Sequence, residues 1–172
     1  METNQDRPRD HRLFIAAADK VLDGWDKVAK TAFWWFILDP SGETLASCQH
    51  GYGYWSAGYK TKALLPAILE AAPNLPEGCT AHVVTDEDWL AAVLNQGPDG
   101  RAATGYRRTN GHALAQQEHW RELDALIVPR RVCLTAGRPR DDDEATQLER
   151  LKDGVKEGAF NIGNRPKEWQ AR

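Results

Sequence analysis

Aromatic and cationic side chains occur together in one stretch of the sequence, in a pattern that suits contact with nucleic acid. The stretch HGYGYWSAGYKTK contains Tyr59, Lys60 and Lys62 after several aromatic residues and glycines. Aromatic faces stack on bases, and lysine or arginine side chains bind phosphates. Arg107 and Arg108 add positive charge in a later loop. Aromatic residues also suit packing at a strand edge, so both interpretations stay open.

Carboxylates follow two apolar runs and precede the last predicted helix. Asp19 comes directly after the run 13–18, and Asp86 comes directly after the run 81–85. Taken alone, Asp19 suits a turn, and Asp86 suits the N-cap of the helix that follows it. The acidic run from Asp142 to Glu144 suits the N-terminus of a helix, where it stabilises the helix dipole.

The composition limits the class of protein. With 172 residues and 41% hydrophobic content, the chain can bury one sizeable core. A formal net charge of -3 gives no global basic field, so any contact with nucleic acid must be a local patch. Three widely spaced cysteines argue against a disulfide framework or a structural zinc site, and a cytoplasmic location is the simplest expectation. The sequence shows no apolar signal region and no long uncharged apolar run, so it indicates neither secretion nor a membrane span.

The sequence predicts strands and helices in an α/β order, and these elements must position the side chains named above. Apolar runs bounded by turn residues predict strands over residues 13–18, 33–38, 43–49, 81–85 and 131–135. Helical spacing predicts helices over residues 63–72, 87–96, 118–127 and around 145–155, whereas 97–115 is predicted as a loop. Pro66 favours a late start for the first helix, because proline is most comfortable in a first turn. We expect a polar extension at residues 1–11, one domain over 12–158 and a tail at 159–172.

Two segments resemble bacterial ribonuclease H. The segment GYRRTNGHALAQQEHWRELDALI, from Gly105 to Ile127, resembles a Gly-Trp-Arg-Thr turn that is followed by Lys-Asn-x-Asp-Leu-Trp. The segment VVTDEDWLAAVL around Asp86 resembles the family's strand ending in Thr-Asp-Ser. The resemblance implies the α/β ribonuclease H-like fold. That fold is a five-stranded mixed sheet with its first three strands antiparallel and helices on both faces.

The same resemblance implies a chemistry and a set of site residues. The family hydrolyses the RNA strand of RNA/DNA hybrids with two Mg²⁺ or Mn²⁺ ions, which four acidic side chains hold. Asp19 and Asp86 then correspond to two catalytic, metal-binding positions. Ala63, or its neighbour Lys62, and Thr146 stand where the other two acids are expected, and Arg138 stands at a family histidine. A candidate third acid comes from Asp142, Asp143 or Glu144.

We therefore expect weak or absent binding of Mg²⁺ or Mn²⁺, because two aspartates alone hold two such cations poorly. Lys62 and Arg138 would attract phosphate without a metal if they face the site. The leading hypothesis is a catalytically weakened or inactive relative that binds RNA/DNA hybrid or duplex RNA. The alternatives are an active ribonuclease H and a protein-interaction module that keeps only the fold. A protein partner stays open, and no membrane partner is expected.

Overall fold

The computed structural model describes residues 10–21, 28–49, 53–56 and 60–161. Most of the predicted extension at residues 1–11 and of the predicted tail at 159–172 lies outside these residues, as does Tyr59. Lys60 is described as the first residue of a helix, without its side chain. Within the described ranges, no helix combines the length and the apolar character needed to cross a membrane.

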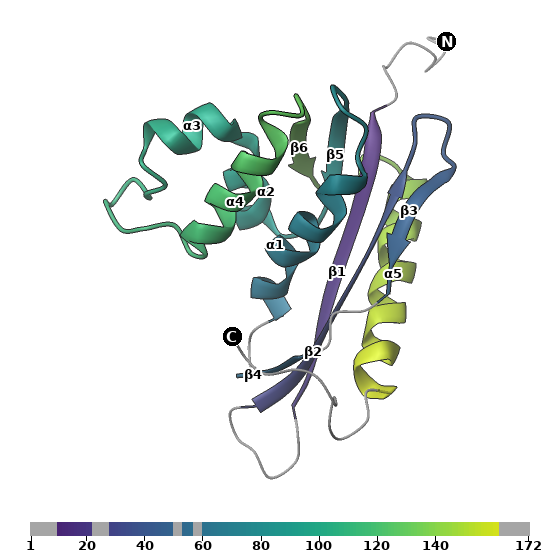
Figure 1. Ribbon diagram of the computed structural model, residues 1–172. Helices are drawn as coiled ribbons and strands as arrows, with labels where there is room; N and C mark the ends of the chain where they lie inside the picture. The colour runs from purple at the N-terminus through teal and green to yellow at the C-terminus, as the bar shows by residue number, and fades with distance from the viewer. Residues whose placement is uncertain (1–9, 22–27, 50–52, 57–59, 162–172) are drawn as a thin grey trace.

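A mixed β-sheet forms the centre of the molecule (Figure 1). Its strands are β1 (His11–Val21), β2 (Val28–Leu38), β3 (Thr44–Cys48), β4 (Gly53–Ser56), β5 (Thr80–Val84) and β6 (Cys133–Gly137). The order is β3-β2-β1-β5-β6, with β1, β2 and β3 antiparallel and with β5 and β6 parallel to β1. The predicted five-stranded sheet is confirmed. The short strand β4, which pairs with β2, was not predicted.

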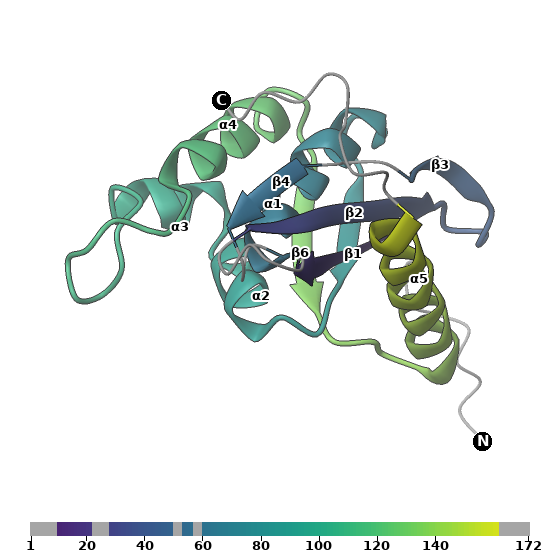
Figure 2. The ribbon, with the colours of Figure 1, turned by 90° about the horizontal axis from the view of Figure 1, so that it is seen from below.

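Helices cover both faces of the sheet, as predicted. They are α1 (Lys60–Ala71), α2 (Asp88–Asn95), α3 (Gly97–Ala103), α4 (Gln117–Ile127) and α5 (Asp142–Asn161), and a 3-10 turn η1 (Ala72–Asn74) follows α1. Figure 2 shows α5 on one side of the sheet and α1 to α4 on the other. Alternation along β1 explains this division, because successive side chains of a strand point to opposite faces. Leu13 and Ile15 belong to the core that includes α1, α2 and α4, whereas Phe14 and Ala16 belong to the core beneath α5.

Helix α1 begins six residues before Pro66, so the prediction of a late start at residue 63 was wrong. A proline inside a helix leaves the carbonyl four residues earlier without its usual N–H donor. That carbonyl belongs to Lys62, and the side-chain amide of Gln116 donates to it at 2.8 Å. A residue from the start of α4 therefore replaces the missing donor and makes Pro66 tolerable inside α1.

Helix α3 lies within the segment that was predicted as a loop. Gly97 takes φ +69, a left-handed conformation that glycine adopts easily, and Pro98 follows in the first turn. Arg101 of α3 is 1% exposed and pairs with Asp124 of α4. This contact joins residues 23 positions apart, so a local sequence pattern does not indicate it.

Glycines of α5 provide a flat surface for Trp34 of β2, which generates a prediction. A Cβ atom added to Gly154 would lie 2.5 Å from Cζ3 of Trp34. Alanine normally stabilises a helix interior by about 1 kcal/mol over glycine. We expect Gly154→Ala to lower the free energy of unfolding by about 1–3 kcal/mol instead, because it overpacks this contact.

Urea unfolding followed by circular dichroism measures this effect. The same substitution in a Trp34→Leu background is the control, because the smaller side chain leaves room for the added methyl. The steric explanation fails if Gly154→Ala costs as much stability in that background as in the parent.

Candidate nucleic-acid interface

Asp86 lies just beyond the carboxyl end of β5, in a cleft of about 220 Å³. We call it the Asp86 cleft. Its walls come from β1, the first turns of α1, the segment after β5, and α5; they include Ala16, Thr61, Asp86, Glu87, Lys152 and Lys156. Carboxyl ends of strands with a helix start nearby are common places for a functional site in α/β proteins. The cleft is therefore where the predicted catalytic residues should be sought.

The strand register sets which residue of β1 lies beside Asp86. The last parallel pair between β1 and β5 is Phe14 with Val84. Two residues further along both strands, the same register brings Ala16 level with Asp86, and both line the cleft. Asp19 lies three residues beyond Ala16, or about 10 Å along the strand.

Asp19 also points to the other face of the sheet. Ile15 and Ala17 contact the core on the α1 side, and Asp19 follows with the same alternation. Its carboxylate accepts a hydrogen bond from the Thr31 hydroxyl at 2.7 Å. Asp86 faces α5 instead, where Lys152 contacts it. The structure thus does not bring Asp19 and Asp86 together as the sequence analysis expected.

An ammonium group from α5 contacts the Asp86 carboxylate. Nζ of Lys152 lies 2.5 Å from Oδ2 of Asp86 and 2.8 Å from Oε1 of Glu149. Partial burial disfavours the charged ammonium, but the hydrogen bonds to the two carboxylates outweigh it and raise the pKa of Lys152. The cleft therefore carries its own positive charge beside its best-placed carboxylate.

The two positions assigned to the missing acids lie away from the cleft. Thr61 and Leu64 are the residues of α1 that line it, whereas Ala63 is buried and 5% exposed. Thr146 on α5 is exposed. It is rotated from Lys152 by about 120° around the helix axis, since each residue turns the helix by about 100°. A one-residue difference in alignment is enough to move a helical side chain to another face.

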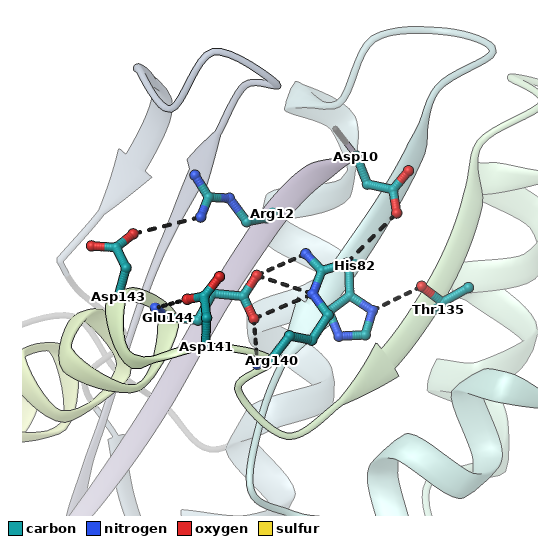
Figure 3. Close-up of polar contacts among 8 residues, drawn as sticks. All are labelled: Asp10, Arg12, His82, Thr135, Arg140, Asp141, Asp143 and Glu144. Carbon is teal, nitrogen blue, oxygen red and sulfur yellow. Dashed lines mark hydrogen bonds and ion pairs between the residues drawn. The ribbon is translucent and has the colours of Figure 1, made fainter. Parts of the chain in front are cut away.

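Three of the four acidic residues at the start of α5, Asp141, Asp143 and Glu144, make structural contacts, as Figure 3 shows. The carboxylate of Glu144, 1% exposed, accepts hydrogen bonds from the Arg140 backbone N–H at 2.8 Å and from its guanidinium at 2.7 Å. Asp143 lies 3.7 Å from Arg12, and Asp141 accepts the backbone N–H of Glu144 at 2.8 Å. Asp142 is exposed. None of these acids lines the Asp86 cleft.

This donor set does not fit the two divalent cations that the family resemblance implies. Two such ions need several carboxylate oxygens that converge from different elements. The described cleft offers the carboxylates of Asp86 and Glu87, and Lys152 and Lys156 oppose them. Glu87 also accepts the indole N–H of Trp89 at 3.0 Å. Among the described residues, no group of three or more histidine, cysteine, aspartate or glutamate side chains could hold a metal.

Arg138, predicted at a family histidine, makes a surface ion pair with α2. Its guanidinium donates to both carboxylate oxygens of Asp88, at 3.1 and 2.8 Å. The hydrogen bonds from Arg138 lower the pKa of Asp88 below its ordinary value. The Arg138 charge is therefore already paired.

Three predicted nucleic-acid-binding residues do come together. Lys62, Arg107 and Arg108 line a second cavity of about 600 Å³, which we call the basic cavity. It lies between α1, α2, the loop 104–116 and α4, and Thr61 lines both it and the Asp86 cleft. The guanidinium of Arg107 donates to the Gly111 carbonyl at 2.9 Å, which orients it. The two cavities are therefore adjacent parts of one candidate interface.

Sequence reasoning missed the residues that define these cavities. Ala16 lies inside a run of three alanines, which carries no sign of its register. Lys152 and Lys156 lie four residues apart on one side of α5, a spacing that could have indicated a cationic stripe. Trp89 follows Asp86 by three residues and lines the basic cavity. Because Trp89 lies in the first turn of the helix that follows Asp86, its sequence position could have indicated that it lies near the cleft.

The cluster in Figure 3 also contains His82, which generates a prediction. Nδ1 of His82 lies 2.9 Å from the Thr135 hydroxyl, while Nε2 is buried without a hydrogen-bond partner in the described part of the chain. Burial and the nearby Arg140 charge lower the pKa of His82 below its ordinary value of 6.5. The folded state therefore favours the neutral ring, and this stabilisation is present above pH 6.5 and lost as the pH falls through the folded-state pKa.

We expect the parent to lose more stability than His82→Gln between pH 7.5 and pH 5.5. Urea unfolding at both values measures the difference. Because the variant keeps the other histidines and all carboxylates, the comparison isolates His82. Equal losses in the two proteins would contradict the proposed protonation.

Comparison with known proteins agrees with this architecture. No protein-family model matches the chain. A curated ribonuclease H from Cupriavidus pinatubonensis is 26% identical over 68 residues, which cover 40% of this chain and 47% of that protein. The matched segment thus spans about half the length of this relative.

Solved structures extend the likeness over most of the chain. The RNase H domain of PFV matches with a TM-score of 0.66 and 14% identity, over 90% of this chain and 96% of that domain. The foamy viral protease-reverse transcriptase in complex with RNA/DNA hybrid matches with a TM-score of 0.65 and 11% identity, over 94% of this chain and 22% of that one. With its mixed sheet, its strand order and helices on both faces, the chain is a ribonuclease H-like protein in its fold.

Proposed function

We propose that the protein is a nucleic-acid-binding ribonuclease H-like domain that holds its ligand without hydrolysing it. The observation that carries this proposal is the Lys152 ammonium, 2.5 Å from Asp86, in a cleft whose β1 and α1 walls present Ala16 and Thr61. That ammonium neutralises Asp86 and repels divalent cations, while Lys156 adds a second positive charge that attracts phosphate oxygens. The cleft therefore suits a phosphate backbone better than it suits the ions that would cleave one.

The ligand class rests on charge and on fold. Lys62, Arg107 and Arg108 form a local cationic surface on a chain whose net charge is -3. Such a patch supplies phosphate contacts without base specificity. The foamy viral neighbour was solved in complex with RNA/DNA hybrid, which supports RNA/DNA hybrid or duplex RNA as the ligand. The alternative, an active ribonuclease H, has less support because Asp19 lies about 10 Å along β1 from Ala16, the residue level with Asp86.

A binding and cleavage experiment tests the proposal. We expect a labelled RNA/DNA hybrid to bind equally in Mg²⁺ and in a chelator at matched ionic strength, and to stay intact. Arg107→Ala with Arg108→Ala should reduce the slope of log affinity against log salt by about 2, because each lost phosphate contact reduces it by about 1.

Arg150→Ala is the matched control, since Arg150 is exposed on α5 on the far side of the sheet. Its salt slope should equal that of the parent. Metal-dependent cleavage that Asp86→Asn abolishes would overturn the proposal, and so would the absence of binding at low salt.

Rebuilding a metal site tests the placement of the lost acids. The variant Ala16→Asp, Thr61→Glu, Lys152→Ala puts carboxylates on β1 and α1 beside Asp86 and removes the internal cation. We expect it to gain binding of Mn²⁺ or Mg²⁺ by calorimetry, together with a metal-dependent rise in melting temperature. The single substitutions should gain little, because one added ligand does not complete the site.

The control variant is Ala63→Glu, Thr146→Asp, Arg138→His, which changes the positions indicated by sequence resemblance. Those positions lie away from the cleft, so this variant should bind metal no better than the parent. An equal gain in metal binding by both triple variants would contradict the assignment of Ala16 and Thr61 as the positions of the lost acids. Circular dichroism establishes that each variant folds.

A further inference from the structure

The basic cavity has the chemistry of a site for one nucleotide. Its walls carry the aromatic ring of Trp89, the apolar side chains of Val93 and Leu114, and the cations Lys62, Arg107 and Arg108. None of its lining residues in the described chain is acidic. A ligand that fills it should therefore combine an anionic group with a flat or apolar one. Its volume of about 600 Å³ falls in the range typical of small-ligand sites.

Trp89 offers a ring of fixed orientation to such a ligand. It is 37% exposed, and its indole N–H donates to the Glu87 carboxylate at 3.0 Å. This bond ties one edge of the ring to the segment that carries Asp86. An exposed indole face held in this way is suited to stack on a nucleobase. Such stacking does not depend on the nucleotide sequence, because every base has a flat aromatic face.

The loop that carries the two arginines is held before any ligand arrives. Arg108 and His112 share a backbone hydrogen bond of 2.7 Å, and Arg107 pairs with Ala113 in an isolated bridge. Tyr106 at the start of this loop donates to Asp124 at 3.0 Å. A loop whose backbone is already hydrogen-bonded loses little backbone entropy on binding, which lowers the cost of placing its two cations at a phosphate.

We infer that the basic cavity binds a single unpaired nucleotide, with its base against Trp89 and its phosphate at Arg107 and Arg108. The inference rests on the proposed function, because Thr61 lines both cavities and a strand that passes the Asp86 cleft can reach this one. The ligand is then a duplex that ends in, or is interrupted by, unpaired nucleotides. A free nucleotide also carries a base and a phosphate, so the experiment tests it separately as a competitor.

The experiment compares a blunt RNA/DNA hybrid with the same hybrid carrying a three-nucleotide single-stranded overhang. Fluorescence anisotropy should show about tenfold tighter binding of the overhang form, since stacking of one base contributes about that factor. Trp89→Leu keeps an apolar side chain and should remove this gain, so that the variant binds the blunt and overhang forms with equal affinity. Trp89→Phe, which keeps an aromatic face, should retain most of the gain.

Free AMP, adenosine and inorganic phosphate serve as competitors. AMP should displace the overhang form at lower concentration than adenosine or phosphate, because it alone provides both the base and the phosphate. Equal affinity of the parent for blunt and overhang forms would overturn this inference and leave the proposed function standing. Absence of binding to both forms would overturn the proposed function itself. A gain that survives Trp89→Leu would show that the base does not stack on Trp89.

Discussion

The buried ion pair between Arg101 and Asp124 holds together the part of the molecule that forms the basic cavity. The guanidinium is 1% exposed, and its Nε lies 3.0 Å from the Asp124 carboxylate. Its NH1 group donates to the carbonyls of Val93 and Leu94, at 2.8 and 3.2 Å, in the last turn of α2. The guanidinium carbon Cζ of Arg101 lies 5.2 Å from the centre of the Trp120 ring. One side chain thus joins α2, α3 and α4.

Such a contact matters more for its geometry than for its net energy. Burying two charges costs several kcal/mol, which their attraction and hydrogen bonds roughly offset, whereas removal of one partner typically costs about 3–5 kcal/mol. Asp124 also accepts the Tyr106 hydroxyl, so the pair fixes the start of the loop 104–116. The buried Arg101–Asp124 pair therefore positions Arg107 and Arg108 of that loop, although neither Arg101 nor Asp124 lines the basic cavity.

The sequence predicted the sheet and its antiparallel start. These features follow from local patterns, such as buried apolar runs and short turns. The position of the first acid could not be predicted in the same way. Three consecutive alanines in β1 fit any register, and the choice of Ala16 beside Asp86 depends on pairing with β5, about 70 residues later in the chain.

Helices raised a related difficulty. The apolar face of α5 was recognised, but a shift of one residue turns a side chain by about 100°, so Thr146 was assigned to a site that it does not face. Asp19 and the run 142–144 were plausible ligands by residue type. The partners that occupy several of them, Thr31, Arg12 and Arg140, are invisible without the fold.

The hydrogen bond from Gln116 to the Lys62 carbonyl has a consequence for the order of folding. Helix α1 lacks one donor of its own because of Pro66, and the substitute comes from a residue 54 positions away. The backbone hydrogen bonding of its first turns is therefore complete only after the start of α4 has packed against them. Those turns carry Thr61, the wall shared by the Asp86 cleft and the basic cavity. Amide protons near this end of α1 and at the start of α4 should thus exchange with solvent as one unit, and both cavities should open and close together.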